Sequence, residues 1–140
     1  MTDEEEVDAL IARFFSAFDN RNGAEPRLAA ITGCFTERAV IARRFDSGVE
    51  LCTVREFADP RIALLTQGAL RDFHEWEVSS TTHIYGGIAT RTLRYAKAGL
   101  LDGNDYAGSG TKCFQLVNMD IGWRIVSLAW VDDERPVRYE

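Results

Sequence analysis

The chain has 140 residues, of which 46% are hydrophobic and 27% charged, and its formal net charge at pH 7 is −6. The length fits a single domain over residues 1–140, and the composition is that of a globular protein rather than a disordered one. Because the longest basic run is the pair Arg43-Arg44 and no apolar run approaches the ~20 residues of a membrane helix, we predict neither a nucleic-acid nor a membrane partner.

The cysteines and the first residues indicate a compartment. Cys34, Cys52 and Cys113 are widely spaced and form no CxxC pair, which is typical of free thiols in a reducing environment. Residues 1–6 are acidic, whereas a secretory signal begins with basic residues and continues with apolar ones. We therefore expect a cytoplasmic protein.

An amphipathic helix is predicted at the start of the chain. Its apolar positions recur at spacings of three and four and are Val7, Leu10, Ile11, Phe14, Phe15 and Phe18. Thr2 and Glu5 have the spacing of a capping box, and residues 20–23 end the helix. A shorter helix is predicted to begin near Pro26, followed by a short strand over residues 39–42.

The segment 53–67 carries two helix start signals. Thr53 and Glu56 form a second possible capping box. Pro60 can open a new helical turn, because proline is tolerated at the first helical position and disfavours helix in the residue before it. We predict a bent or two-piece helix that ends at Gly68.

The rest of the chain is predicted to form long strands separated by short turns. The strands cover residues 70–84, 88–98, 106–119 and 123–131. Short connections make neighbouring strands antiparallel, so the second half is predicted to be a meander. Helices grouped before such a sheet define an α+β fold, in which a twisted sheet can curl around the helices and leave an aromatic-lined hollow.

Four local patterns resemble one superfamily. They are FFSAFD at 14–19, FTERAV at 35–40, YGGIA at 85–89 and GWRIV at 122–126. With the order of elements, they are similar to the nuclear-transport-factor-2-like superfamily, which includes ketosteroid isomerase, scytalone dehydratase and polyketide cyclases. The resemblance spans nearly the whole chain. It implies a cone-like curved antiparallel sheet wrapped around N-terminal helices and enclosing an apolar cavity, and a homodimer that packs through the sheet. These motifs are structural, so the resemblance implies a fold rather than an activity.

The first long strand carries the residues with acid–base chemistry. Side chains of a regular strand alternate between faces, and the even-numbered set of residues 70–84 is the more apolar. This assigns Asp72, His74 and Trp76 to the face toward the helices, with the Cα atoms of Asp72 and His74 roughly 7 Å apart. His74 would act as general base or acid, because imidazole titrates near neutral pH, and Asp72 would orient its ring.

Two alternatives to this catalytic hypothesis stay open. His74 can be a structural histidine of the core or its rim, with Asp72 paired to an arginine, and the sequence favours this interpretation. A bulge or a register error would turn the whole set outward.

Six residues are candidates for contact with a ligand. Arg91 and Tyr95 share the more apolar face of their strand, so Arg91 can reach the cavity and bind a carboxylate or enolate with its planar fork. The alternative for Arg91 is an ion pair with Asp72 or with an acidic residue of a helix. The remaining candidates are the aromatic residues Phe18, Trp76, Phe114 and Trp130.

On the last predicted strand, we assume that side chains alternate strictly between the two faces of the sheet. Trp123 and Ile125 are assigned to the face opposite Leu128 and Trp130. The acidic residues 132–134 are expected to form a solvated end.

No cofactor is predicted. His74 and His83 are the only histidines, and neither has the spacing of a metal ligand pair. The glycine-rich patterns of phosphate-binding loops are absent from the sequence. We expect neither a metal nor an organic cofactor.

Two functions remain open from the sequence, which does not decide whether the protein is an enzyme. The first is a binding domain whose cavity holds a small apolar molecule with a carbonyl or acid group. The alternative is a cofactor-free isomerase, cyclase or dehydratase, with His74 and Asp72 as acid–base pair and Arg91 or Tyr95 stabilising negative charge. Convergence of these residues in a cavity would favour the enzyme, and an outward His74 would favour binding.

Overall fold

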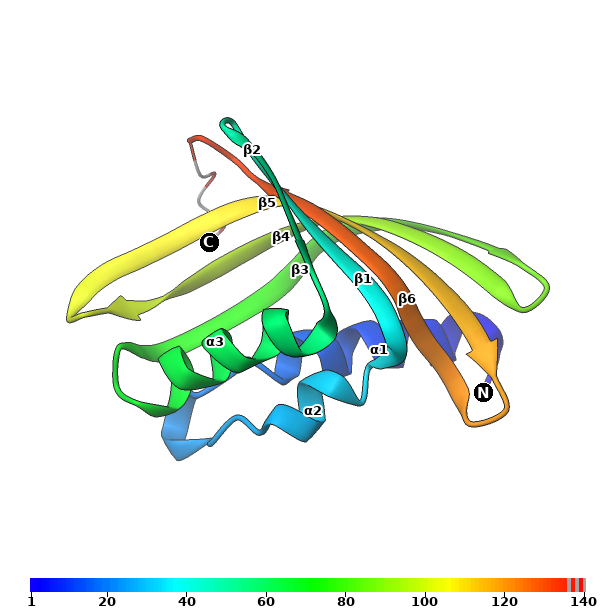
Figure 1. Cartoon of the computed structure of the whole chain (residues 1–140), viewed down its shortest axis with the longest axis horizontal. Coiled ribbons are helices and arrows are strands. Elements are labelled where there is room, and N and C mark those ends of the chain that lie inside the picture. Colours follow the sequence, from blue (N-terminus) through cyan, green and yellow to red (C-terminus); the bar gives the residue numbers. More distant parts are fainter. Residues whose placement is uncertain (136, 138, 140) are drawn as a thin grey trace.

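The computed structural model describes residues 1–135, 137 and 139, and within them a six-stranded sheet curves over a layer of helices (Figure 1). The elements in chain order are α1 (Asp3–Ser16), the 3₁₀ turn η1 (Arg21–Gly23), α2 (Leu28–Thr32), β1 (Phe35–Phe45), β2 (Gly48–Cys52), α3 (Val54–Thr66), β3 (Leu70–Tyr85), β4 (Ile88–Leu101), β5 (Asn104–Met119) and β6 (Gly122–Asp132). Among the described helices, none is long and apolar enough to cross a membrane.

The two long helices begin at the capping boxes that the sequence predicts. The Thr2 hydroxyl accepts the backbone N–H of Glu5 at 3.1 Å, and the Glu5 carboxylate accepts the backbone N–H of Thr2. In α3 the corresponding bonds join Thr53 and Glu56 at 3.2 and 2.9 Å. Both predicted starts are thus confirmed. Pro60 lies inside α3 without dividing it, so the two-piece alternative is wrong.

The strands lie in the order β2-β1-β6-β5-β4-β3. The meander from β3 to β6 is confirmed, since each of its neighbouring pairs is antiparallel. The sheet as a whole is mixed, because β1 runs parallel to β6. No short turn joins these two strands, so turn geometry does not set their relative direction. β2, which the sequence did not predict, forms a hairpin with β1.

A β-bulge near the start of β3 reverses the predicted faces of that strand as far as Glu77, where a further register shift restores them, and Ile84 packs against the core as predicted. The pairing of β3 with β4 shifts register between Arg71 and His74, and Asp72 has a φ of 49° in the left-handed region. An extra residue in one strand moves the alternation by one. Phe73 is therefore buried and Glu75 faces the helices, whereas Asp72 is exposed. The prediction that Asp72 and His74 face inward is wrong for this reason.

A second bulge aligns the aromatic residues of β6. The pairing with β5 skips Val126, so the inward positions are odd-numbered before it and even-numbered after it. Trp123, Ile125, Leu128 and Trp130 are all buried in the core. The assignment of these residues to two opposite faces is therefore wrong.

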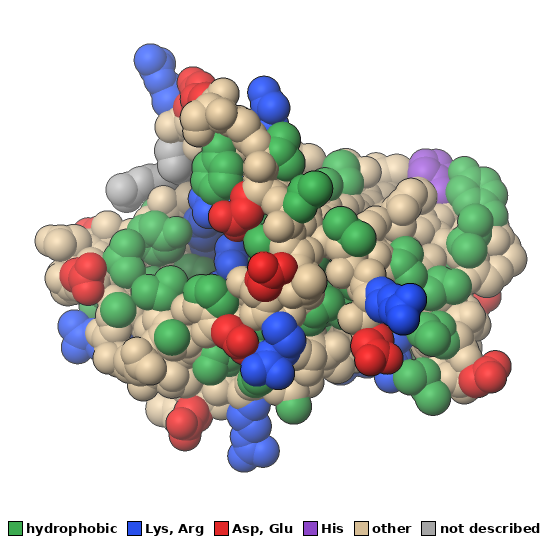
Figure 2. Space-filling model, viewed as in Figure 1, with side chains coloured by type: hydrophobic (Ala, Val, Ile, Leu, Met, Phe, Trp, Pro, Cys, Tyr) green, Lys and Arg blue, Asp and Glu red, His purple; other side chains and the backbone are tan. Residues whose placement is uncertain are grey.

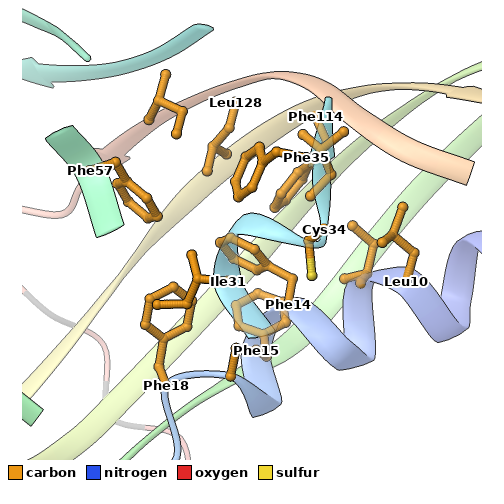
Figure 3. Close-up of a cluster of buried hydrophobic side chains, with 14 of the residues drawn as sticks. Leu10, Phe14, Phe15, Phe18, Ile31, Cys34, Phe35, Phe57, Phe114 and Leu128 are labelled. Carbon is orange, nitrogen blue, oxygen red and sulfur yellow. The ribbon is translucent and has the colours of Figure 1, made fainter. Parts of the chain in front are cut away.

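The core between the sheet and the helices is built on phenylalanine rings (Figure 3). Phe14 of α1 makes edge-to-face contacts with Phe18, Phe35 and Phe114 at centroid distances of 5.2, 6.0 and 5.4 Å. Such pairs stabilise beyond the area they bury. Phe114 is 1% exposed and does not line the pocket described below, so the structure gives this predicted ligand contact a packing role.

Asn20 fastens the bulged strand to the helices. Its side-chain amide donates to the carbonyl oxygens of Leu65 and Leu70 at 3.0 and 2.8 Å. Its side-chain oxygen accepts the backbone N–H of Phe73 at 2.8 Å, directly after the bulge. One side chain thus joins the end of α1, the end of α3 and β3.

We predict that Asn20→Ala destabilises the protein by about 3 kcal/mol, because three partly buried hydrogen bonds of about 1 kcal/mol each are lost. Urea unfolding followed by circular dichroism measures the change. The matched control is Asn118→Ala, since Asn118 is exposed and makes no side-chain hydrogen bond to the described residues. Equal stability of the two variants would contradict the role given to Asn20.

Candidate functional site

A pocket of about 300 Å³ lies between α3 and the concave face of the sheet. Figure 2 shows this hollow from the side of Figure 1, with Lys and Arg side chains visible inside it beside hydrophobic ones. Its apolar lining includes Phe14, Phe18, Phe57, Leu65, Phe73 and Trp130. Six of the sixteen lining residues are charged, whereas the sequence predicted an apolar hollow.

Asp132, at the end of β6, is the centre of one charged group. Its carboxylate accepts hydrogen bonds from Arg43 at 2.7 Å and from the Tyr95 hydroxyl, and Lys97 lies 3.6 Å away. Burial alone would raise the pKa of Asp132, but Lys97, Tyr95 and Arg43 together lower it. The expectation that residues 132–134 form a solvated end is wrong at Asp132.

Lys112, on β5, forms a second charged group. Its ammonium lies 3.1 Å from Glu75 and over the rings of Tyr95 and Trp130, at 4.0 and 4.9 Å from their centroids. The side chain of Lys112 is 7% exposed and that of Glu75 is 10% exposed. Burial lowers the pKa of Lys112, because it disfavours the charged form more than Glu75 stabilises it.

Arg61 places a third positive group on the α3 side of the pocket. Its guanidinium lies 4.2 Å from the ring centroid of Phe57 and 5.3 Å from that of Trp130, and it donates to the Phe57 carbonyl at 2.9 Å. Burial, and then the charge of Arg43, lowers the pKa of Arg61. Within the described part of the chain Arg61 forms no ion pair.

Two glycines of β5 make room for these polar side chains. A Cβ atom at Gly108 would lie 2.6 Å from Cε of Lys97, and one at Gly110 would collide with the Tyr95 hydroxyl. Both positions face the concave side between Tyr106 and Lys112. The absence of side chains at these positions is what lets Lys97 and Tyr95 reach Asp132.

Three of the predicted ligand contacts lie at or beside the pocket. Phe18 and Trp130 line it. Tyr95 is fully buried directly beneath it, where its hydroxyl donates to Asp132 and its ring faces Lys112. Burial, and then Asp132, raises the pKa of Tyr95, so its hydroxyl remains a donor. Contact of these residues with a ligand stays a prediction.

Arg91 lies outside the pocket, in an ion-pair cluster under α1. It donates to Asp8 at 2.6 Å, to Glu77 at 2.8 and 2.9 Å, and to Thr82 at 3.2 Å. The open alternative of an ion pair with an acidic residue of a helix is the observed arrangement. With two carboxylates around one guanidinium, this cluster has no free positive charge to offer a ligand.

His74 and Trp76 lie on the face of β3 opposite Glu75, as the first bulge requires. Their rings stack with centroids 4.4 Å apart, and Trp76 is absent from the pocket lining. His74 Nδ1 is buried without a hydrogen-bond partner among the described residues. Burial, followed by the charge of Arg21, lowers the pKa of His74, which favours the neutral ring.

The sequence held a signal for the charged residues of the pocket that the prediction did not use. Lys112 lies two residues before Phe114 on β5, and Lys97 lies two residues after Tyr95 on β4. Each lysine therefore shares a strand face with a buried aromatic residue. A charged residue on the apolar face of a strand indicates a functional or ion-paired position. Glu75 had no such signal, because its face depends on the bulge at Asp72.

The donor set of the described residues does not match a metal centre. No group of three or more His, Cys, Asp or Glu side chains within that part of the chain could hold an ion. The acidic side chains of the pocket are each engaged by lysine, arginine or tyrosine.

Comparison with solved structures identifies the fold. A nuclear-transport-factor-2-like superfamily protein from Salmonella enterica superposes with a TM-score of 0.74 at 14% identity, over 99% of this chain and 94% of that chain. A hexachlorocyclohexane dehydrochlorinase gives 0.74 at 11% identity, over 98% and 90%. A protein with a cystatin-like fold from Novosphingobium aromaticivorans gives 0.69 at 18% identity, over 92% and 80%.

The chain thus has the cone-like α+β fold of the nuclear-transport-factor-2-like superfamily, as the sequence patterns implied. No protein-family model matches the sequence, and no curated protein matches it. At these identities the structural likeness shows the fold alone, and this fold carries both enzymes and binding domains.

We predict that the pKa of His74 lies below the ordinary value of about 6.5 and rises in Arg21→Ala, because a nearby positive charge is removed. NMR titration of the His74 ring protons measures the pKa in the native chain and in the variant. Asp72→Asn is the control and should leave the value in place, since Asp72 is exposed and is not among the causes of the shift. If the pKa of His74 changes strongly in Asp72→Asn and not in Arg21→Ala, the hypothesis of a His74–Asp72 pair would be supported instead.

Proposed function

We propose that the protein binds a small apolar or aromatic molecule that carries an acid group, and that the pocket under α3 is its site. The observation that supports this is a surplus of positive charge. Arg43, Arg61, Lys97 and Lys112 line the pocket with only Glu75 and Asp132 to balance them, so the lining carries +2 with all groups ionised. The chain as a whole carries −6.

The distribution of groups suits such a ligand. Aromatic and aliphatic side chains supply most of the lining, and a few placed polar groups fix orientation, as in small-molecule sites generally. Arg61 offers a guanidinium that no described carboxylate engages, placed over the rings of Phe57 and Trp130. A carboxylate can accept two parallel hydrogen bonds from such a fork.

The alternative of a His–Asp isomerase, cyclase or dehydratase receives no support from the geometry. His74 and Asp72 are absent from the lining, and Arg91 is engaged by two carboxylates. Ligand binding is therefore the function that the arrangement favours.

Binding of a fluorescent aromatic anion tests this proposal. We expect 8-anilinonaphthalene-1-sulfonate to bind more tightly than N-phenyl-1-naphthylamine, which has the same rings without the acid group. Arg61→Gln should weaken binding of the anion about tenfold and leave the neutral probe unchanged, since hydrogen bonds to charged groups contribute about 1.5–3 kcal/mol.

Arg55→Gln is the matched control for this substitution. Arg55 is on the same helix, exposed, and paired with Asp59 one turn away. It should leave both affinities unchanged. Equal affinity for the two probes, or equal effects of the two variants, would refute the proposal.

We also propose that the partner of the chain is a second copy, packed through the convex face of the sheet. On that face Thr92, Cys113, Ala129 and Ala42 are successive neighbours across four strands, and none is charged. Thr92, Cys113 and Ala129 are exposed. Because the chain carries −6, two copies repel each other least where their surfaces are neutral.

We predict that Ala129→Arg converts a dimer to a monomer, because it places two like charges at the centre of the interface. Size-exclusion chromatography with light scattering measures the mass. Ala29→Arg, on the exposed side of α2, should leave the dimer intact. A monomeric native chain, or a dimer that persists in Ala129→Arg, would show that this face is not the interface.

A further inference from the structure

The only two lysines of the chain are both in the pocket. Of sixteen basic residues fourteen are arginines, and the two lysines are Lys97 and Lys112. Either residue type can supply a positive charge, but only lysine loses its proton readily enough to act as a nucleophile. The chain therefore gathers its side-chain amines at one site, and a need for charge alone does not explain this choice.

The two amines have different surroundings. Lys97 is 17% exposed and lies near Asp132 and over the ring of Tyr106. Lys112 is 7% exposed, and its ammonium is enclosed by two aromatic rings and one carboxylate. Burial and the nearby charge of Lys97 both lower the pKa of Lys112. Desolvation beside a second cation is the usual way in which a lysine becomes a nucleophile.

Glu75 supplies the base that this chemistry requires. Its carboxylate lies 3.1 Å from Lys112 Nζ, within reach of direct proton transfer. Transfer of one proton from the ammonium to this carboxylate frees the nitrogen lone pair for addition to a carbonyl. The same acid can later return the proton.

We propose that Lys112 is a nucleophile that forms an imine with the carbonyl carbon of the ligand. Glu75 first takes a proton from the ammonium. The amine nitrogen then adds to the carbonyl carbon, and one of its two N–H protons passes to the carbonyl oxygen. This oxygen receives a second proton from Glu75 and leaves as water, which gives a protonated imine beside the Glu75 carboxylate. No oxidant or reductant takes part.

The placement of the cations defines the class of carbonyl compound. Lys112 and Arg61 lie against the same indole ring, at 4.9 and 5.3 Å from its centroid. A ligand that meets both carries an acid group as well as its carbonyl. The inference rests on the proposed binding of an apolar acid and narrows the ligand to an aromatic or apolar oxo acid.

Reductive trapping of the native chain tests the inference. The protein is incubated with phenylpyruvate and cyanoborohydride at pH 7, and peptide mass spectrometry locates the reduced adduct. We expect at least about tenfold more adduct at Lys112 than at Lys97, and much less at either with phenylacetone, which lacks the acid group. Equal labelling of the two lysines, or labelling of Lys97 alone, would overturn the proposal.

Two variants and one binding measurement distinguish failure of the imine proposal from failure of the proposed binding function. Lys112→Arg keeps the charge and should abolish the adduct while its circular dichroism spectrum stays that of the native chain, and Arg55→Gln, outside the pocket, should retain the adduct. A native chain that binds this anion but yields no adduct at Lys112 overturns the imine alone. A native chain that neither binds the anion nor yields an adduct overturns the imine and the proposed binding function together.

Discussion

The buried ammonium of Lys112 imposes a condition on the structure around it. A charge in a low-dielectric interior costs several kcal/mol unless a partner and hydrogen bonds compensate for it. Glu75 is that partner, and it faces Lys112 only because the bulge at Asp72 turns the following residues of β3 toward the helices. Without the extra residue, Glu75 would point away and Lys112 would be buried unpaired. The bulge and the ion pair are therefore parts of one arrangement.

The bulge in turn depends on contacts outside the sheet. Asn20, at the end of α1, accepts the N–H of Phe73 directly after the extra residue, and its amide holds the carbonyls at the end of α3 and the start of β3. Gly99 of β4 lies opposite, where a Cβ atom would come within 3.0 Å of the Phe73 backbone. A link therefore runs from α1 through Asn20 to the charged group of the pocket. Such a site is held by rigid elements rather than by a mobile loop.

This dependence explains which features the sequence could predict. Capping boxes at Thr2 and Thr53 and the hairpin turns of the meander are local signals, and each was confirmed. The inward face of β3 is not local, because one extra residue reverses it and its position is set by Asn20, more than 50 residues earlier in the chain. The prediction for His74 and Asp72 failed there. Lys112 and Lys97 could have been found, since strict alternation on their own strands places them beside buried aromatic residues.

The two ends of the concave face show how one fold treats buried charge in two ways. Under α1, the single cation Arg91 is engaged by two carboxylates, Asp8 and Glu77, so the hollow that these residues line has no surplus of positive charge. Under α3, the carboxylates of Glu75 and Asp132 face twice as many cations, and an open volume of about 300 Å³ remains among them. A buried excess of like charge costs free energy unless an anion neutralises it. The pocket under α3 combines this excess with a mostly apolar lining, which is the arrangement expected if the missing counter-charge belongs to the proposed ligand.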